Sequence, residues 1–532
     1  MMFIKEIFLG REKLFTPNAI IFHGALLVMS FAFVYVFSYS TSFGYDLLGG
    51  DSAIFQAIGK YWTQGYLPYV DLFDHKGPLI FFINAIGYMI YPRSGIMALQ
   101  IISLYLSCLF IWRAMELYSS SVWKVFFLLL TLIYYAAHYE EGNHVTEYSV
   151  AFLAAATYCF LRSLKEDKFP PLYGFIYGLG FGACFLIRLS DAAQICCQCF
   201  LVAVFLLQSR DFKILWQNVL GFLAGFVIIC LPFVIYFAAH DALYDMIYGT
   251  ILLNLNYTID ETFHLPPKFR VIHALVHYLP FFIMAIASLF GLKEKPKSRL
   301  LQSGLFIGAA IAFMLINLRP SDQYAMIFLA VAPILFAVLY ESHHMLHNIL
   351  QTQKVSFNKL LIKFLIVLTV IQVLILTFFL KSILLVNETP VRMFFSAYDK
   401  RAELLNSDER QNILALRALI PDSERKSFVI WGNFCTGSHW ILQADMPPRE
   451  RLFMNTSQCA KMDPKLRQEY FGNLRRDYPL WILYGTRPDR KLDEPPSSTE
   501  DAELEQLLAE RYLLKGEVFI YPQLMKLYRL KE

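Results

Sequence analysis

Charged residues gather just after the first long apolar stretch of the chain, in the segment from Gly50 to Pro78. This segment carries Asp51 near its start and Asp74, His75 and Lys76 near its end. Taken singly, each acid also fits a solvated external loop. Ionisable groups next to hydrocarbon are costly, however, and mark functional sites in membrane proteins. Together with the residues described next, they indicate chemistry.

A second group of polar residues is expected on the same side of the membrane. The end of a later apolar stretch carries Arg188, with Asp191 beside it. The other members are His138, Glu140, Glu141, His144, Glu147, Asn254, Asn256, Tyr257, Lys268, Arg270, Arg319, Asp322 and Tyr324. Acids and cations at a lipid–water boundary suit the transfer of a group from a lipid phosphate. The cations hold the phosphate oxygens, and a carboxylate takes the proton from the attacking hydroxyl or amine.

Several of these residues also fit a plainer role. Arg188 and Arg319 close apolar stretches, where an arginine that reaches back to the interface is ordinary. Arginines on the external face nevertheless run against the positive-inside bias. His138 and His144 are candidate metal ligands with glutamates of the same loop, but their spacing matches no strong metal motif. Lys76 precedes an apolar helix start, where a phosphate meets free backbone N–H groups.

The elements that must hold these residues are membrane helices. The chain has 532 residues, of which 57% are hydrophobic and 17% charged, and its mean hydropathy is +0.45. These values exclude an ordinary soluble domain and predict a polytopic α-helical membrane protein. Pro78 to Tyr91 is apolar but too short to cross, and is expected to lie in the interface. Eleven spans are predicted, near 18–40, 94–117, 122–138, 148–164, 171–188, 191–208, 215–238, 271–292, 300–317, 323–341 and 359–380.

The placement of Lys and Arg predicts the orientation. One set of loops is basic (5–13, 162–168, 210–213, 293–299 and 354–363), and the alternate loops are acidic or mixed (41–77, 138–147, 239–270 and 318–322). The N-terminus is therefore expected in the cytoplasm, and an odd number of spans puts everything after residue 380 outside. The net charge of +4 is explained by the basic loops. The sequence has no basic stripe with interleaved aromatics, which is the pattern that would indicate a nucleic acid as a partner.

Two domains are expected: a transmembrane domain over 1–380, with a catalytic first external loop at 41–93, and an extracytoplasmic α/β domain over 381–532. Strand-like segments at 427–431, 480–484, 517–521 and 525–529 alternate in the second with helical patterns at 400–420, 463–476 and 499–512. The loop that follows the first strand shapes an acceptor site or is a plain surface loop; the sequence leaves both open.

The cysteines divide between the two domains. A cluster of three at 196–199 lies in a predicted span, where packing is the favoured role over metal binding. Only Cys435 and Cys459 fall in the external domain. A disulfide between them and two free thiols remain alternatives, because sequence does not show whether their Cα atoms approach closely enough.

Three short stretches resemble one family. The first external loop has an acid near its start, Gly50-Asp51-Ser52-Ala53, and then a Tyr-x-Asp-x-x-x-His-x-x-Pro stretch from Tyr69 to Pro78. The second loop, Glu141 to Tyr148, is similar to the Gly-Asn-x-Thr-Glu stretch of bacterial members, and a glycine-rich span ends in Leu186-Ile187-Arg188. These stretches look like the glycosyltransferase-C superfamily, in the branch of protein O-mannosyltransferases and the aminoarabinose transferase of lipid A.

The resemblance implies roles for particular residues. Asp51 would deprotonate the acceptor, and Glu147 would steady the acceptor or a divalent metal, whose requirement stays open. Lys76 and Arg188 would hold the donor phosphate. Further substrate-binding residues are Asp74, His75, Arg319 and Tyr324. Many protein O-mannosyltransferases carry Asp-Glu at the first position, whereas Ser52 follows the acid here, which favours a glycolipid or glycan acceptor over a protein.

The predicted function is an inverting membrane glycosyltransferase, in the inner membrane of a bacterial cell. It would pass a sugar from a polyprenyl-phosphate donor to a lipid-linked glycan, lipid or protein acceptor at the external face of the bilayer. A transporter or flippase of lipid-linked intermediates is the competing class. It predicts internal repeats and charges in the middle of spans. A non-catalytic envelope assembly protein is the third, and it would leave Asp51 and Glu147 replaceable.

Overall fold

The computed structural model describes residues 16–44, 48–120, 122–139, 141–255, 300–301, 304–305, 307–308, 322–334, 337–338, 340, 409–432, 436–454, 456, 459, 463–486, 499–520 and 523–532. Two compact units make up the chain. The first, here called the helical unit, comprises Met1–Ser38, Leu99–Pro232 and Phe263–Phe395. The second, the mixed unit, comprises Tyr39–Ala98, Phe233–Thr262 and Ser396–Glu532. The segment predicted as the first external loop and the C-terminal segment therefore belong to one unit, although they lie far apart in the sequence.

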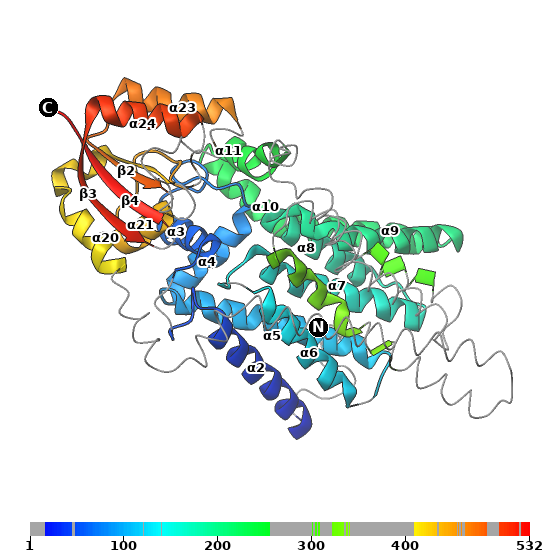
Figure 1. Ribbon diagram of the computed structural model, residues 1–532. Helices are drawn as coiled ribbons and strands as arrows, with labels where there is room; N and C mark the ends of the chain where they lie inside the picture. Colours follow the sequence, from blue (N-terminus) through cyan, green and yellow to red (C-terminus); the bar gives the residue numbers. More distant parts are fainter. Residues whose placement is uncertain are drawn as a thin grey trace, which may run out of the picture. The chain divides into compact units, whose positions relative to one another are not determined.

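The helical unit is built of long apolar helices (Figure 1). They are α2 (Pro17–Phe37), α5 (Ser94–Glu116), α6 (Trp123–Ala137), α7 (Val145–Glu166), α8 (Pro171–Ile187), α9 (Ala193–Gln208) and α10 (Phe212–Ala239). The same unit contains the 3₁₀ helices η1 (Leu189–Ala192) and η4 (Asp322–Ala330). Helix α5 begins, and helix α10 ends, in the mixed unit.

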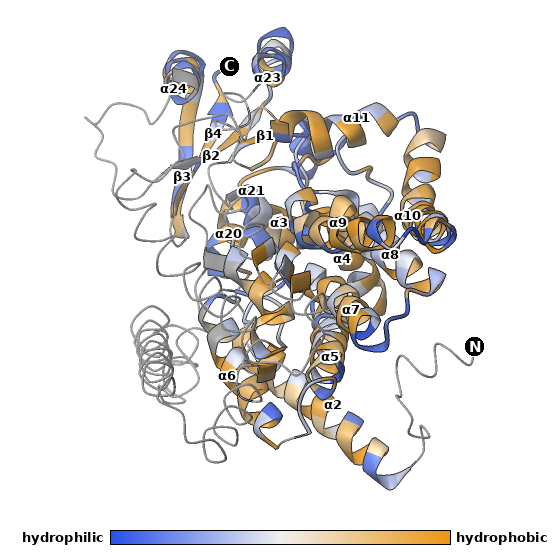
Figure 2. Ribbon diagram, turned by 90° about the vertical axis from the view of Figure 1, so that its right-hand side faces the viewer, coloured by the Kyte–Doolittle hydropathy of each residue, from blue (hydrophilic) through white to orange (hydrophobic). Residues whose placement is uncertain are grey.

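Four helices of the described part are long and apolar enough to cross a membrane: Pro17–Phe37, Ser94–Glu116, Leu189–Gln208 and Phe212–Ala239. Figure 2 shows hydrophobic colouring over most of the ribbon of these helices. The first seven predicted spans coincide with helices to within a few residues. The predicted spans 271–292 and 359–380 lie outside the described residues, and 300–317 and 323–341 lie only partly within them. The predicted interfacial helix is α4 (Pro78–Ile90).

Glycines bring α8 and α10 into backbone contact. A Cβ atom on Gly174 would lie 2.3 Å from the carbonyl oxygen of Asn218, and one on Gly178 would lie 1.9 Å from that of Phe222. Gly225 faces α8 in the same way. Small residues four apart let membrane helices approach this closely. The glycine-rich stretch noted in the sequence is therefore a helix-packing surface.

The mixed unit combines a four-stranded sheet with short helices. Its strands are β1 (Phe428–Trp431), β2 (Trp481–Thr486), β3 (Tyr512–Ile520) and β4 (Gln523–Leu530), in the order β1-β2-β4-β3. Strands β1 and β2 are parallel, and the other pairs are antiparallel. The four predicted strands are confirmed, with longer bounds for the last two.

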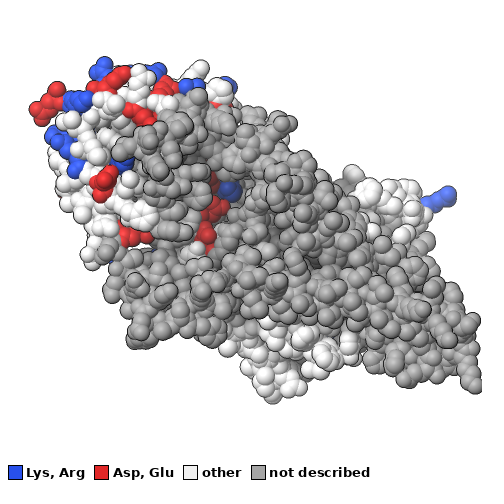
Figure 3. Space-filling view, in the orientation of Figure 1, with Lys and Arg blue, Asp and Glu red and all other residues white. Residues whose placement is uncertain are grey.

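Helices cover both faces of this sheet. They are α20 (Glu409–Ala418), α21 (Thr436–Ala444), α23 (Pro464–Arg476) and α24 (Thr499–Arg511), with η5 (Asp422–Ser427) before β1. On β1, Phe428 stacks on Trp440 of α21, whereas Trp431 contacts Tyr470 of α23. Trp431 Nε1 also donates to Asp501 Oδ1 of α24 at 2.8 Å. Charges of both signs gather over these C-terminal elements on the face shown in Figure 3.

The remaining elements of the mixed unit come from the first loop and the middle of the chain. They are α3 (Asp51–Trp62), α4, α11 (Leu243–Ile247) and the π-helical turn η2 (Tyr248–Leu252). Helices α3 and α4 cross where Gly59 meets Asn84, because a Cβ atom on Gly59 would lie 2.6 Å from that of Asn84. Gln56 bonds Tyr88, and Trp62 contacts Phe82. The two helices therefore run in opposite directions.

Candidate functional site

In the helical unit, the first turn of α7 buries Glu147. Its Oε2 accepts hydrogen bonds from the backbone N–H of Asn143 at 2.9 Å and from Gln100 Nε2 at 3.0 Å. Its Oε1 accepts one from the Tyr139 hydroxyl and one from Gln100 Nε2 at 3.2 Å. The chain makes this pocket with two residues of positive φ before the helix, Gly142 (79°) and Asn143 (60°), which glycine and asparagine tolerate best. Both carboxylate oxygens of Glu147 are thus bound by protein groups.

Arg188 lies beside this turn, at the C-terminal end of α8. Its Nη2 donates to Thr146 Oγ1 at 2.8 Å and to Asp191 Oδ1 at 2.5 Å. Its Nε donates to the same Asp191 oxygen at 2.8 Å, and its guanidinium carbon lies 4.2 Å from the centre of the Tyr324 ring. The structure therefore brings together three residues singled out in the sequence, Glu147, Arg188 and Tyr324, around one helix end.

Asp191 is more central to this cluster than the sequence indicated. It is 1% exposed. Its Oδ1 holds Arg188, and its Oδ2 has no hydrogen-bond partner among the residues the structure describes. An arginine fixed by two bonds to one carboxylate and by an aromatic face is well oriented for a planar anion.

In the mixed unit, Asp51 is the first residue of α3. It is half-buried, and within the described ranges it makes no hydrogen bond or ion pair. An acid in the first turn is favourable for the helix, since it faces the positive end of the helix dipole. The preceding Gly50 is the N-cap and supplies no side chain to cap the helix. The carboxylate is therefore available to a ligand.

Asp74, His75 and Lys76 form a chain of contacts before α4. Asp74 Oδ1 lies 3.2 Å from His75 Nδ1, and His75 Nε2 lies 3.1 Å from Lys76 Nζ. Burial acts to raise the pKa of the Asp74 carboxyl, but the charges of Lys76 and His75 outweigh it and hold that pKa below its usual range. Asp74 Oδ2 is buried and has no partner among the described residues.

Tyr69 and Asn254 hold the main chain of this segment. The Tyr69 hydroxyl donates to the Lys76 carbonyl at 2.8 Å, and Asn254 Nδ2 donates to the His75 carbonyl at 2.7 Å. Tyr69 is fully buried with φ of 71°, a left-handed conformation that is rare for an aromatic residue. Lys76 is followed by Gly77, the N-cap of α4, which provides no side-chain cap. The backbone N–H groups of the first turn are thus not capped by a side chain.

Asp51 and Lys76 do not come together in the mixed unit. Helices α3 and α4 cross near Gly59 and Asn84 in opposite senses. Asp51 lies at the start of α3, and Lys76 lies just before the start of α4. Each is eight positions from the crossing, or roughly 12 Å at the rise of an α-helix. The two therefore lie toward opposite ends of the helix pair.

Some expected members fall outside the described residues. They are Glu140, Asn256, Tyr257, Lys268, Arg270, Arg319 and Cys435, together with the side chain of Asp322. Cys459 is a free, buried thiol in the structure, and burial raises the pKa of its thiol to about 12. Among the described residues, no three His, Cys, Asp or Glu side chains gather closely enough to hold a metal ion.

Two functional contacts escaped the sequence. His439 and Arg451 lie in the segment that the sequence left open as an acceptor site or a plain loop, and both contact backbone carbonyls of the 41–77 segment, those of Gly49 and Tyr69. No local pattern marks them, since each acts on residues more than 380 positions away.

Comparison with solved structures finds a broad likeness. No family model matches the chain, and no curated protein matches it. Among solved structures, the chain is similar to the crystal structure of the Archaeoglobus fulgidus oligosaccharyltransferase, solved in complex with zinc and sulfate. The similarity covers 86% of this chain and 67% of that chain, at 14% sequence identity and a TM-score of 0.41. A likeness of this size assigns neither site residues nor an activity.

Proposed function

We propose that this protein is an integral-membrane glycosyltransferase. It transfers a sugar from a polyprenyl-phosphate donor to a glycan or lipid acceptor at the external face of the bilayer, with inversion at the anomeric carbon. The helices that can cross a membrane support the bilayer setting, and the apolar chain of such a donor would lie along them. Residues Phe82, Met89 and Ile90 of α4 expose large apolar surfaces that suit a helix in the interface.

One observation supports this proposal most strongly: the Asp51 carboxylate has no structural partner in the described part of the chain. Asp74 is paired with His75, Asp191 with Arg188, and Glu147 has four hydrogen bonds from its neighbours. A group that is bound by protein on all sides is a poor proton acceptor for a substrate. Asp51 is half-buried and its carboxylate is bound by no protein group in the described part of the chain, which suits a general base.

The reaction assigned to Asp51 is a single displacement. The acceptor hydroxyl gives its proton to the carboxylate as its oxygen attacks the anomeric carbon. The bond between that carbon and the phosphate oxygen breaks, and polyprenyl phosphate leaves with the bonding electrons. The sugar is joined to the acceptor, and the proton is later released from Asp51 to water.

The two cations receive different roles. A phosphate held at Lys76 would lie toward the far end of the α3–α4 pair from Asp51. We therefore assign Lys76, with the uncapped N-terminus of α4, to capture of the donor phosphate before reaction. Arg188, which is fixed by Asp191 and Tyr324, is assigned to the leaving phosphate, whose charge rises as the bond breaks.

The experiment is transfer by the purified protein in lipid nanodiscs, with polyprenyl-phosphate sugars carrying a radiolabelled sugar and with a panel of glycan and lipid acceptors. Release of polyprenyl phosphate and label in the acceptor are both measured. Asp51→Asn keeps the shape and removes the base, so turnover should fall about a hundredfold. The matched control is Asp167→Asn, an exposed acid at the end of α7 whose left-handed conformation asparagine accepts.

Two results would count against the proposal. If a well-folded Asp51→Asn protein transfers at the wild-type rate, the base is another group. If wild-type protein releases no polyprenyl phosphate but moves the intact donor between leaflets of a vesicle, the protein is a flippase.

A further inference from the structure

The start of α3 is held from one side by the first loop itself. Ser40 Oγ donates to Ser52 Oγ at 2.8 Å, and Gln56 Nε2 donates to the Ser40 carbonyl at 3.1 Å. Arg93 donates to the same carbonyl, from Nε at 3.2 Å and Nη2 at 3.1 Å. These bonds secure the residue that follows Asp51.

His439, in the C-terminal segment, makes a second contact with the residues that precede α3. It is a residue of α21, which packs on α3 in the mixed unit. Its Nε2 lies 2.6 Å from the backbone carbonyl oxygen of Gly49, two residues before Asp51. Gly49 has φ of 75°, a conformation that residues with a Cβ atom rarely adopt. The bond therefore fixes a turn that aims the chain into α3.

Glu409 fixes the orientation of this histidine. Its Oε1 lies 2.8 Å from His439 Nδ1 and also accepts a hydrogen bond from Gln443 Nε2 at 2.9 Å. A backbone carbonyl and a carboxylate can only accept. When Nε2 donates to the Gly49 carbonyl, Nδ1 faces the Glu409 carboxyl group, and this contact sets the orientation of the ring. His439 is 5% exposed, whereas Glu409 is partly exposed.

We propose that His439, oriented by Glu409, is a positioning residue for Asp51. It holds the carbonyl of Gly49 so that the carboxylate two residues later points at the acceptor. This assignment rests on the proposed function, since it names a second residue for the same reaction. It gives the C-terminal segment a role in catalysis that requires no contact with either substrate.

The expected effect is on turnover and not on donor binding. Loss of the bond frees the turn before α3, and a displacement of about 1 Å in a catalytic group costs up to roughly a hundredfold in rate. The donor phosphate is held elsewhere, so the KM for the donor should stay within about twofold.

The test compares three variants of the full-length protein in nanodiscs. His439→Ala should lower kcat at least about tenfold. Glu409→Gln keeps an oxygen that accepts from Nδ1 but removes the charge, and should give a smaller loss. The double variant should be no worse than His439→Ala alone, because both act through one bond. His240→Ala is the control, since His240 is exposed and its Nδ1 contacts the carbonyl of Tyr236 in its own helix.

Hydrogen exchange by mass spectrometry gives a readout that does not depend on activity. In His439→Ala, peptides that cover residues 48–56 should exchange faster, while those of strands β1 and β2 keep wild-type protection. Unchanged exchange at 48–56 would overturn the positioning role, whatever the enzyme assay shows. Faster exchange with normal kcat would also overturn it. If wild-type protein transfers no sugar, the proposed function fails, yet the exchange experiment still decides whether His439 holds the turn.

Discussion

Arg451 Nη1 donates a hydrogen bond to the backbone carbonyl of Tyr69 at 2.9 Å, across 382 positions of sequence. The arginine is fixed by Glu469, at 2.8 Å from Nε and 2.6 Å from Nη2, and by Asp245 at 3.1 Å. Its own carbonyl accepts from Phe73 N–H at 2.9 Å, and its guanidinium lies over the Phe73 ring. One side chain of the C-terminal segment thus holds the turn that carries Asp74, His75 and Lys76.

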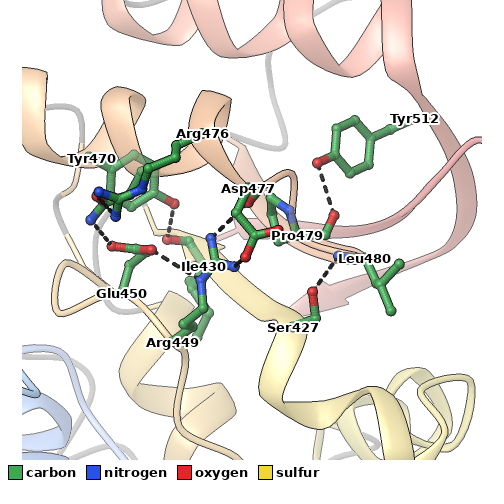
Figure 4. A network of polar contacts seen from close by, with 11 residues as sticks. Ser427, Ile430, Arg449, Glu450, Tyr470, Arg476, Asp477, Pro479, Leu480 and Tyr512 are labelled. Carbon is green, nitrogen blue, oxygen red and sulfur yellow. Dashed lines mark hydrogen bonds and ion pairs between the residues drawn. The ribbon is translucent and has the colours of Figure 1, made fainter.

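Arg451→Ala should therefore loosen this turn. The left-handed conformation of Tyr69 is costly and persists only while its surroundings enforce it. We expect faster amide exchange over residues 66–77 and an increase of about tenfold in the KM for the donor, because Lys76 is no longer held. Arg449→Ala is the matched control. Figure 4 shows Arg449 with Glu450 and Asp477, at 3.2 Å and 2.9 Å, both within the C-terminal segment. Equal effects of the two variants would show that the domain has merely been destabilised.

Substitutions of Lys76 and Arg188 should change different kinetic constants. Lys76→Ala is expected to raise the KM for the donor about tenfold with kcat within twofold, whereas Arg188→Ala should lower kcat about a hundredfold. Arg188→Lys should resemble Arg188→Ala, because lysine cannot bond Asp191 and Thr146 while stacking on Tyr324. The control is Arg162→Ala, which removes an arginine that bonds Glu166 at the other end of α7. A rise in KM alone for Arg188→Ala would reverse our assignment of the two cations.

Glu147→Gln should destabilise the helical unit. Gln100 Nε2, the Asn143 N–H and the Tyr139 hydroxyl all donate to this carboxylate, and of these only the hydroxyl can also accept, so the new amide N–H₂ would replace accepted hydrogen bonds with a poorer set. The expected loss is about 1 to 3 kcal/mol in the free energy of unfolding, measured by thermal denaturation of the purified protein. Gln100→Glu combined with Glu147→Gln exchanges the acid and the amide and should recover part of it. A variant as stable as wild type but without activity would instead place Glu147 in direct contact with substrate.

Asp74 should make stability depend on pH in the acid range. Its pKa is lowered in the folded protein by Lys76 and His75. Its contribution is therefore fully present above the unfolded pKa of about 3.9 and is lost as the pH falls through the folded value. Asp74→Asn should cost about 2 kcal/mol at pH 7, and the difference from wild type should shrink only below about pH 4. Thermal melts of both proteins between pH 3 and pH 7 check this. A difference that already shrinks between pH 7 and pH 5 would mean that another group dominates.

The sequence predicted the elements well where a pattern is local. Apolar stretches predicted α5 and α8 to within one residue at each end and α2 to within three, and short strand-like segments predicted the four strands. The turn before α7 could also be predicted from a local pattern, because Gly142, Asn143 and Glu147 lie in one short stretch at the start of a helix.

What lay beyond the sequence was long-range pairing. The segment around His439 and Arg451 has no motif, and its partners at Gly49 and Tyr69 are backbone carbonyls, which every residue has. The periodicity of apolar residues also does not predict in which relative direction two short helices cross. The separation of Asp51 from Lys76 follows from Gly59, which has no Cβ atom to keep α4 away. The predicted boundary at residue 380 stays a prediction, while the compact units join 39–98 with 396–532.

The pairing of Tyr69 with Arg451 has a consequence for synthesis of the protein. Ribosomes add about 5 to 20 residues per second, so the first loop emerges roughly 20 to 75 s before the arginine that holds it. During that interval the turn that carries Asp74 and Lys76 lacks the contact with Arg451, and the start of α3 lacks the contact with His439. Nascent or truncated chains would already contain the first loop but could not lock it in the arrangement described above. The arrangement described above is thus completed only after the C-terminal segment that carries His439 and Arg451 has been made, and a shorter nascent chain lacks both contacts.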